Sequence, residues 1–210
     1  ALLEWQIELG VTESIAETPI NRFEVPEILP KPERAPAPVM AHKGAPSPEL
    51  VDAANVARQL ASGASDIAAL KAAVTGFEHC ELKRGARSLV FGEGNPAARI
   101  MVIGDAPGRH EDIEGRPFAG PAGLMLDKMF AAIDMGRQVP DVEKSIYVTT
   151  VLPWRTPQDR EPGVRELEMM LPFVQRHIEL VAPDILVLMG NVSCQALTGQ
   201  KGVARLRGRW

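Results

Sequence analysis

One stretch of the chain brings together two acids, a turn of small residues and an aromatic ring. It runs Gly-Asp-Ala-Pro-Gly over residues 104–108, continues to Glu111, and is followed by an Arg-Pro-Phe element that ends at Phe118. A carboxylate can orient an attacking water or stabilise a developing positive charge, and an aromatic ring can stack on a planar ligand. The bland alternatives are an ordinary turn, a solvated pair or helix amino terminus at residues 111–112, and a core position for Phe118.

The elements around this stretch predict where it lies. Residues 99–103 form a short apolar run that ends at Gly104, which is typical of a strand buried in a parallel sheet. Ligands of such sheets bind beyond the carboxyl ends of the strands. The stretch that follows residue 103 is therefore predicted to be an active-site loop.

From residue 88 onward, strand and helix patterns alternate. We predict strands over residues 88–91, 99–103, 146–152 and 185–189, and helices over residues 122–135, 164–181 and 192–197. Two further helices are predicted upstream, over residues 50–60 and 66–74, each after a Ser-Pro or Ser-Asp start signal. This order favours an α/β fold, a three-layer α/β/α sandwich around a mainly parallel sheet.

The N-terminal part differs in composition from the rest. Apolar residues between Leu2 and Leu9 predict a short amphipathic helix, which is a candidate for binding a protein partner. Residues 26–48 hold seven prolines and favour an extended linker. We therefore divide the chain into residues 1–48, a helical extension with a Pro-rich linker, and residues 49–210, the α/β domain.

Charge and cysteine usage exclude several classes of protein. The 23 Lys and Arg against 27 Asp and Glu give a net charge of −4, which argues against strong nonspecific binding to polyanions. The last ten residues nevertheless carry four cations and no acid, a local edge suited to a phosphate backbone. Two cysteines form no disulfide framework, and no apolar run approaches the roughly 20 residues of a membrane span. With no secretory pattern at residues 1–5, we expect a cytoplasmic protein with no membrane partner.

Several ordered segments resemble family 4 uracil-DNA glycosylases over roughly residues 75–210. Besides the two elements above, the similar segments are residues 90–96, 123–127, 146–148, 153–155, 172–173 and 207–210. Ordered agreement of this kind is more specific than one short motif. The resemblance implies hydrolysis of the N-glycosidic bond between uracil and deoxyribose in DNA, a base-excision repair reaction.

The resemblance also implies roles for residues of this chain. The target base is flipped into a pocket, and its loss leaves an oxocarbenium-like sugar and a uracil anion. Glu111 is the first candidate for the carboxylate beside the sugar, and Asp105 is the second. Phe118 would stack on the uracil, and Thr150 occupies the position of the residue that reads its edge. The turn whose backbone amides would hold the pyrimidine or the water consists of Ala106, Pro107 and Gly108.

Cationic side chains are the candidates for contacts with the DNA backbone. Arg155 and Arg160 belong to a Pro-rich loop, where contacts with phosphate are expected. The remaining candidates are His110, Arg207 and Arg209.

The chain departs from the family at the base reader. Thr150 stands where the family has an asparagine, and one hydroxyl cannot reproduce the donor and acceptor of a planar amide. Loss of such a matched reader can cost roughly 10⁴-fold in discrimination. We therefore predict weak or altered base selectivity.

The chain also departs at the iron-sulfur cluster that the family usually carries. Only Cys80 matches one of the four ligand positions, and the others hold Phe77, Pro153 or Trp154, and Met170. One thiolate cannot hold a four-iron four-sulfur cluster, so no cofactor and no metal site are predicted. Either apolar packing of these residues replaces the cluster, or the region is disordered.

A third departure concerns the leaving group. The family's His-Pro motif, which polarises the uracil carbonyl, would lie beyond Trp210, so we expect the C-terminal part of the domain to be missing from this sequence. Loss of such a donor costs on the order of 2.7 to 4 kcal/mol by analogy with oxyanion donors. We therefore expect impaired excision by this chain.

A second class of function is a noncatalytic module that keeps the glycosylase fold and binds DNA or a protein partner. A third, an unrelated nucleotide-binding α/β protein, is disfavoured because the sequence has no Gly-x-x-x-x-Gly-Lys-Ser/Thr loop.

Overall fold

The computed structural model describes residues 48–206, with side chains from residue 52 onward. The predicted N-terminal helix, the linker up to residue 47, and the candidate DNA contacts Arg207 and Arg209 lie outside the described residues.

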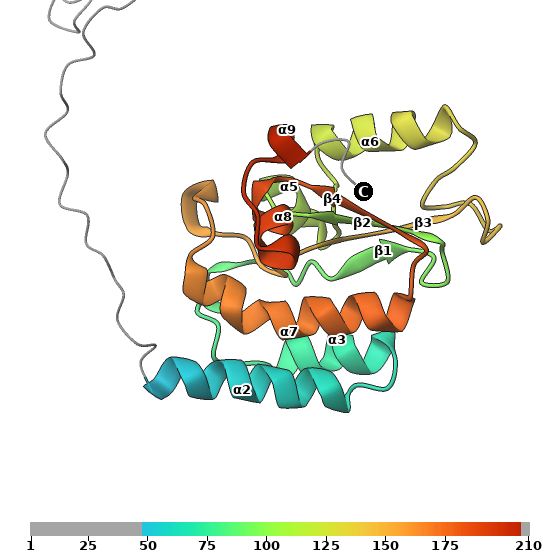
Figure 1. Ribbon diagram of the computed structural model, residues 1–210. Coiled ribbons are helices and arrows are strands. Elements are labelled where there is room, and N and C mark those ends of the chain that lie inside the picture. Colours follow the sequence, from blue (N-terminus) through green and yellow to red (C-terminus); the bar gives the residue numbers. More distant parts are fainter. Residues whose placement is uncertain (1–47, 207–210) are drawn as a thin grey trace, which may run out of the picture. The chain divides into compact units, whose positions relative to one another are not determined.

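A four-stranded sheet forms the centre of the domain (Figure 1). Its strands are β1 (Gly92–Gly94), β2 (Ile100–Gly104), β3 (Ile146–Thr150) and β4 (Ile185–Met189), in the order β1-β3-β2-β4. β2 runs parallel to β3 and to β4, whereas β1 is antiparallel to β3. Gly104 is opposite Thr150 on one side and Met189 on the other, so the carboxyl ends of the three parallel strands form one edge of the sheet.

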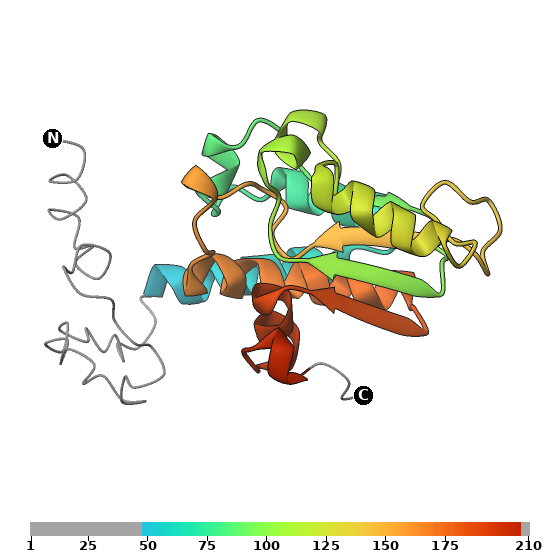
Figure 2. The ribbon, with the colours of Figure 1, turned by 90° about the horizontal axis from the view of Figure 1, so that it is seen from above.

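Helices cover both faces of this sheet (Figures 1 and 2). On one face lies α7 (Val164–Val181), with α2 (Pro48–Gly63) and α3 (Ile67–Gly76) packed against it; on the other lie α5 (Arg109–Glu114) and α6 (Pro121–Ala131). The shorter helical elements are α4 (Leu82–Gly85), a 3₁₀ turn (Pro157–Asp159), α8 (Asn191–Thr198) and α9 (Val203–Leu206). The predicted three-layer sandwich with a mainly parallel sheet is thereby confirmed.

Successive residues of the central strands point to opposite faces. Met101 and Ile103 pack with Val174 of α7, whereas Val102 and Val148 pack with Leu126 of α6. Apolar side chains are therefore required at nearly every position of β2 and β3, which explains why these strands appear in the sequence as continuous apolar runs.

The first predicted strand is wrong. The prediction placed the strand at residues 88–91, three of which are apolar, but the strand is formed by Gly92–Gly94 and is antiparallel to its neighbour. Any side chain at Gly92 would collide with the hydroxyl of Tyr147 on β3, so the close approach of these two strands requires glycine there. Strand propensity cannot identify a three-residue segment that pairs closely because two of its residues are glycines.

The helices predicted over residues 50–60 and 66–74 are confirmed as α2 and α3. Asp66 caps α3 by accepting a 2.8 Å hydrogen bond from the amide of Ala69. Helix α5, over residues 109–114, was not predicted as an element. None of the helices within residues 48–206 combines the length and the apolar character needed to cross a lipid bilayer.

Candidate active site

Asp105 is the first residue after β2, at the carboxyl edge of the sheet. Its Oδ1 accepts a 2.7 Å hydrogen bond from the amide of Ser193, in the first turn of α8. Gly190, with φ +141°, precedes that helix, and a side chain there would overlap the carboxylate. Within the described part of the chain Oδ2 has no hydrogen-bond partner. Asp105 is thus held through one oxygen and presents the other.

Glu111 has both carboxylate oxygens engaged by backbone amides. Oε2 accepts from the amide of Gly108 at 3.0 Å, and Oε1 accepts from the amide of Gly120 at 2.8 Å. Gly108 precedes α5 and Gly120 precedes α6, so one carboxylate satisfies the amino ends of both helices. The helix-terminus alternative for Glu111 is therefore what the geometry shows, and it joins the active-site loop to α6.

The neighbouring acid holds a different segment. Asp112 is buried, and its Oδ1 accepts from the amides of Arg87 and Ser88 at 2.8 and 3.1 Å. The alternative of a solvated acid pair is therefore wrong for Asp112, which fixes the chain that enters β1.

Of the three residues predicted to bind a ligand through their backbone amides, only one has an amide available within the described range. Pro107 has no amide hydrogen, and the amide of Gly108 is already donated to Glu111. The amide of Ala106 has no acceptor among residues 48–206, so it is the donor that this turn can offer to a ligand.

Phe118 lies at the carboxyl end of β2. A Cβ at Gly104 would lie 2.8 Å from Cζ of the phenyl ring, so the glycine makes room for the ring directly before Asp105. Phe118 has φ +52°, which is uncommon for a residue with a side chain, and its ring is only partly buried beside the apolar cluster of Val102 and Leu126. The position thus combines core contact with an exposed part of the ring.

Thr150 faces the same side of the sheet as Phe118. It is opposite Gly104 in the parallel register, and it follows Ile146 and Val148, which point toward α6. The residue is buried, and its hydroxyl donates a 2.7 Å hydrogen bond to the carbonyl of Leu152. The hydroxyl hydrogen is therefore used within the protein, and only acceptor capacity remains for a ligand.

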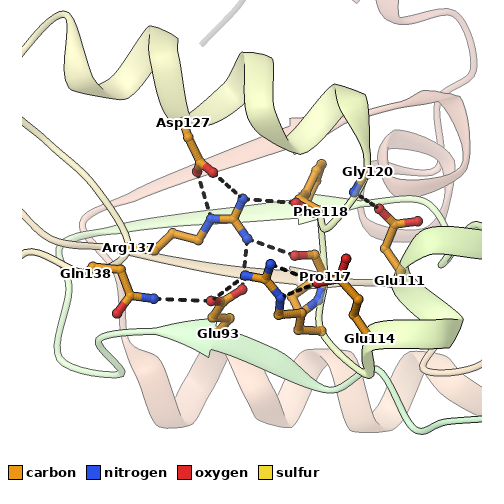
Figure 3. A network of polar contacts seen from close by, with 10 residues as sticks. Glu93, Glu111, Glu114, Pro117, Phe118, Gly120, Asp127, Arg137 and Gln138 are labelled. Carbon is orange, nitrogen blue, oxygen red and sulfur yellow. Dashed lines mark hydrogen bonds and ion pairs between the residues drawn. The ribbon is translucent and has the colours of Figure 1, made fainter.

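A buried arginine that was not among the predicted site residues contacts the backbone of Phe118. Figure 3 shows Arg137 between Asp127 of α6 and the backbone of residues 117–118, with Glu93 of β1 beside it. The side chain of Arg137 is 5% exposed. Arg137 and Gln138 lie between α6 and β3 and belong to no recognisable sequence motif, so nothing in the sequence pointed to this arginine.

Three of the candidate DNA contacts belong to the described residues, and one of them, His110, lies beside Gly120. His110 is exposed on α5. Arg155 forms a bidentate ion pair with Asp159, at 2.7 and 2.9 Å, and Arg160 forms one with Glu166, at 2.9 and 2.5 Å. Their role in phosphate binding stays a prediction.

The region of the expected iron-sulfur ligands is filled by apolar side chains. Phe77, Cys80, Trp154 and Met170 belong to one buried cluster, each no more than 3% exposed. Burial raises the pKa of the Cys80 thiol, which disfavours the thiolate that a metal requires. No three His, Cys, Asp or Glu side chains within residues 52–206 form a metal-binding group. The residues present do not fit a four-iron four-sulfur cluster, and their side chains pack in one apolar cluster. That this packing replaces the cluster stays a prediction.

The structure therefore places Asp105, Phe118 and Thr150 at the carboxyl edge of the sheet, with Phe118 and Thr150 on the side of α6 and the carboxylate of Asp105 beside Gly190 and α8. Glu111 is linked to them through the backbone on either side of the loop. This edge of the sheet thus carries a carboxylate oxygen, a backbone amide without an acceptor among the described residues, and an aromatic ring, which are the groups that orienting a water and stacking a base require.

Comparison with known proteins places this geometry in a family. The family model described as the uracil-DNA glycosylase superfamily matches residues 91–210. The chain is 36% identical to a type-4 uracil-DNA glycosylase of Archaeoglobus fulgidus over 116 residues, which are 55% of either chain. It is 32% identical to that of Sulfurisphaera tokodaii over 146 residues, 67% of this chain and 64% of the relative. It is 34% identical to a type-4 uracil-DNA glycosylase of Saccharolobus solfataricus over 138 residues, which are 63% of this chain and 62% of the relative.

The chain thus spans between about half and two thirds of the length of these relatives. The matched region contains the active-site loop, the phenylalanine and the edge threonine described above. The chain therefore belongs to the uracil-DNA glycosylase superfamily, and its similarity within that superfamily is to the type-4 enzymes.

Proposed function

We propose that this chain removes uracil from DNA by hydrolysing the N-glycosidic bond, in line with its similarity to proteins named type-4 uracil-DNA glycosylases. The observation that carries the proposal is the pairing of a carboxylate that has one oxygen unengaged, on Asp105, with the ring of Phe118 against Gly104 at the same strand end.

The reaction follows from these two groups. The extruded uracil stacks on Phe118, which supplies apolar contact to a base taken out of the helix. Oδ2 of Asp105 orients a water and stabilises positive charge as it develops on the deoxyribose. The water oxygen bonds to C1′, its proton passes to the carboxylate, and the bond from C1′ to the base breaks with its electron pair on uracil. The products are an abasic site and the uracil anion, which takes up a proton from solvent while the Asp105 carboxyl releases one.

This assignment reverses the order of the two acids. Glu111 has both oxygens committed to the amides of Gly108 and Gly120, so it holds the loop rather than the water. Asp105 uses one oxygen for Ser193 and keeps the other. We therefore assign the water to Asp105 and loop positioning to Glu111.

The proposed reaction needs no iron-sulfur cluster in this chain. The support is the buried packing of Phe77, Trp154 and Met170 around a single thiol. Iron and acid-labile sulfide measured on protein purified without oxygen should both be far below one cluster per chain. A stoichiometric cluster would contradict this part of the proposal.

The test is abasic-site formation on single-stranded DNA that carries one uracil, with protein in excess. Asp105→Asn keeps the oxygen that caps α8 but removes the charge, so the fold should be retained while release slows about 10²-fold or more. Asp184→Asn is the matched control, because this exposed aspartate pairs with Arg99 at the other end of the sheet. Equal rates for the Asp105 variant and the wild type would reject the proposed role.

Glu111→Gln should act differently. A glutamine has one acceptor for two amides, so both the melting temperature and the rate should fall together. Binding of uracil-containing DNA without any base release by the wild type would instead identify a noncatalytic module that keeps the fold.

A further inference from the structure

The guanidinium of Arg137 uses every hydrogen-bond donor that it has. Nε and one Nη2 hydrogen bind the two oxygens of Asp127, each at 2.8 Å. One Nη1 hydrogen binds Oε2 of Glu93 at 2.8 Å. The remaining two bind the carbonyls of Pro117 and Phe118 at 2.8 and 3.0 Å (Figure 3). Five donors meet five acceptors, which is the complete capacity of an arginine.

The two carbonyl contacts fix the backbone of one residue. The carbonyls of Pro117 and Phe118 belong to the peptide planes before and after the α carbon of Phe118. Holding both planes determines φ and ψ of Phe118, which adopts φ +52°. A residue other than glycine keeps a positive φ only when the surrounding structure holds its backbone in that conformation. Arg137 supplies that constraint from behind the ring.

The acceptors on the far side anchor the guanidinium itself. Asp127 belongs to α6 and Glu93 to β1, so Arg137 is fixed relative to the helix and to the sheet. Glycines then shape the space around the residue that it holds. A side chain at Gly123 would overlap the carbonyl of Phe118, and one at Gly104 would touch its ring.

We propose that Arg137 is the positioning residue for Phe118, holding the ring in the orientation that stacks on an extruded base. The part concerning the base rests on the proposed function, whereas the part concerning the ring does not. Lysine cannot replace Arg137, because an ammonium has three donors and no planar fork to reach both carbonyls and both carboxylates.

The orientation of the ring is tested by ¹⁹F NMR on protein labelled with 4-fluorophenylalanine. The chain has six phenylalanines, and the signal that disappears in Phe118→Leu is assigned to Phe118. Arg137→Lys should shift or broaden that signal and leave the buried Phe77 and Phe173 unchanged. The control is Arg99→Lys, which disturbs an exposed arginine paired with two acids at the opposite strand end. An unmoved Phe118 signal in a folded Arg137→Lys protein overturns the proposal.

A second variant covers the case in which Arg137→Lys does not fold. Asp127 is 45% exposed, so Asp127→Asn removes one of the anchors at a smaller cost to folding. It should move the same signal in the same direction by a smaller amount. A folded Asp127→Asn protein with an unchanged signal also counts against the proposal.

Uracil release separates positioning from a general structural effect. Single-turnover release by Arg137→Lys should fall about 10²-fold, the scale expected for a displacement of about 1 Å. The dissociation constant for DNA should stay within about twofold, because the buried guanidinium does not face the phosphate backbone. In a Phe118→Ala background the same change should add less than about twofold, because both act through one ring.

The two proposals fail in different ways. If the wild type releases no uracil, the proposed function fails, and the fluorine signal still decides whether Arg137 holds the ring. If the wild type releases uracil and the loss in Arg137→Lys is fully additive with Phe118→Ala, the function stands and the positioning role is rejected.

Discussion

Acidification is expected to destabilise the domain through one buried histidine, His177 of α7. Its side chain stacks on Phe91 with ring centroids 4.5 Å apart, and its Nε2 lies 2.9 Å from the hydroxyl of Tyr147. The residue is 4% exposed. Burial lowers the pKa of His177 from 6.5 to about 4, because the imidazolium loses its hydration there without gaining an anion.

The sign and size of the effect follow from linkage. Between about pH 6.5 and about pH 4 the unfolded chain binds a proton at this histidine and the folded chain does not, so stability falls as pH falls through this window. The pKa difference of roughly 2.5 units corresponds to about 3 kcal/mol in full. About 2 kcal/mol of this is expected to be lost between about pH 7.5 and about pH 5.

Urea denaturation followed by far-ultraviolet circular dichroism at the two pH values measures this loss. Carboxylates also titrate in this window, so the informative quantity is the difference between the wild type and His177→Gln, whose amide can still bond to Tyr147. The wild type should lose about 2 kcal/mol more than the variant on acidification. His79→Gln, which replaces an exposed histidine, is the matched control at the same two pH values. Equal pH dependence in wild type and His177→Gln would refute the reasoning.

Three further substitutions test the site and the core. Thr150→Asn should raise uracil release and its preference over cytosine, because an amide offers a donor and an acceptor that the committed hydroxyl cannot; an unchanged preference in the oligonucleotide assay contradicts this. Gly104→Ala should place a methyl 2.8 Å from the ring of Phe118, cost about 1–3 kcal/mol, and slow release more than it alters DNA binding. Phe77→Ala should cost about 3–5 kcal/mol in urea, and a loss below about 1 kcal/mol would show that packing does not hold this region.

The parallel strands and the long helices were predictable because each depends on short-range pattern. β2 and β3 are apolar at almost every position since both faces are covered, and Asp66 caps α3 with its own side chain. The strand Gly92–Gly94 was not predictable in this way. It pairs closely with β3 because Gly92 leaves room for the hydroxyl of Tyr147, a residue more than fifty positions away.

The site divides along the same line. The sequence predicted that Asp105, Glu111 and Phe118 belong to one functional segment. It did not predict which of the two acids has a carboxylate oxygen without a hydrogen bond. That depends on the amide of Ser193, 88 positions away, and on the amide of Gly120, which follows a turn. The sequence shows that a carboxylate is present. Whether one of its oxygens stays without a hydrogen bond depends on which donors the fold brings close to it.

Arg137 extends this argument to residues without any motif. Its type predicts five donors, and an unpaired buried arginine would be costly, so its acceptors had to exist somewhere in the fold. Two of them are carbonyls of the residue pair that carries the ring, and these hydrogen bonds cross 19 and 20 positions of sequence. The acids Asp127 and Glu93 already neutralise the charge of Arg137. Its hydrogen bonds to the two backbone carbonyls therefore have a further effect. The geometric effect of Arg137 falls on Phe118, the residue with φ +52° at the strand end, because the two carbonyl contacts hold the peptide planes on either side of it.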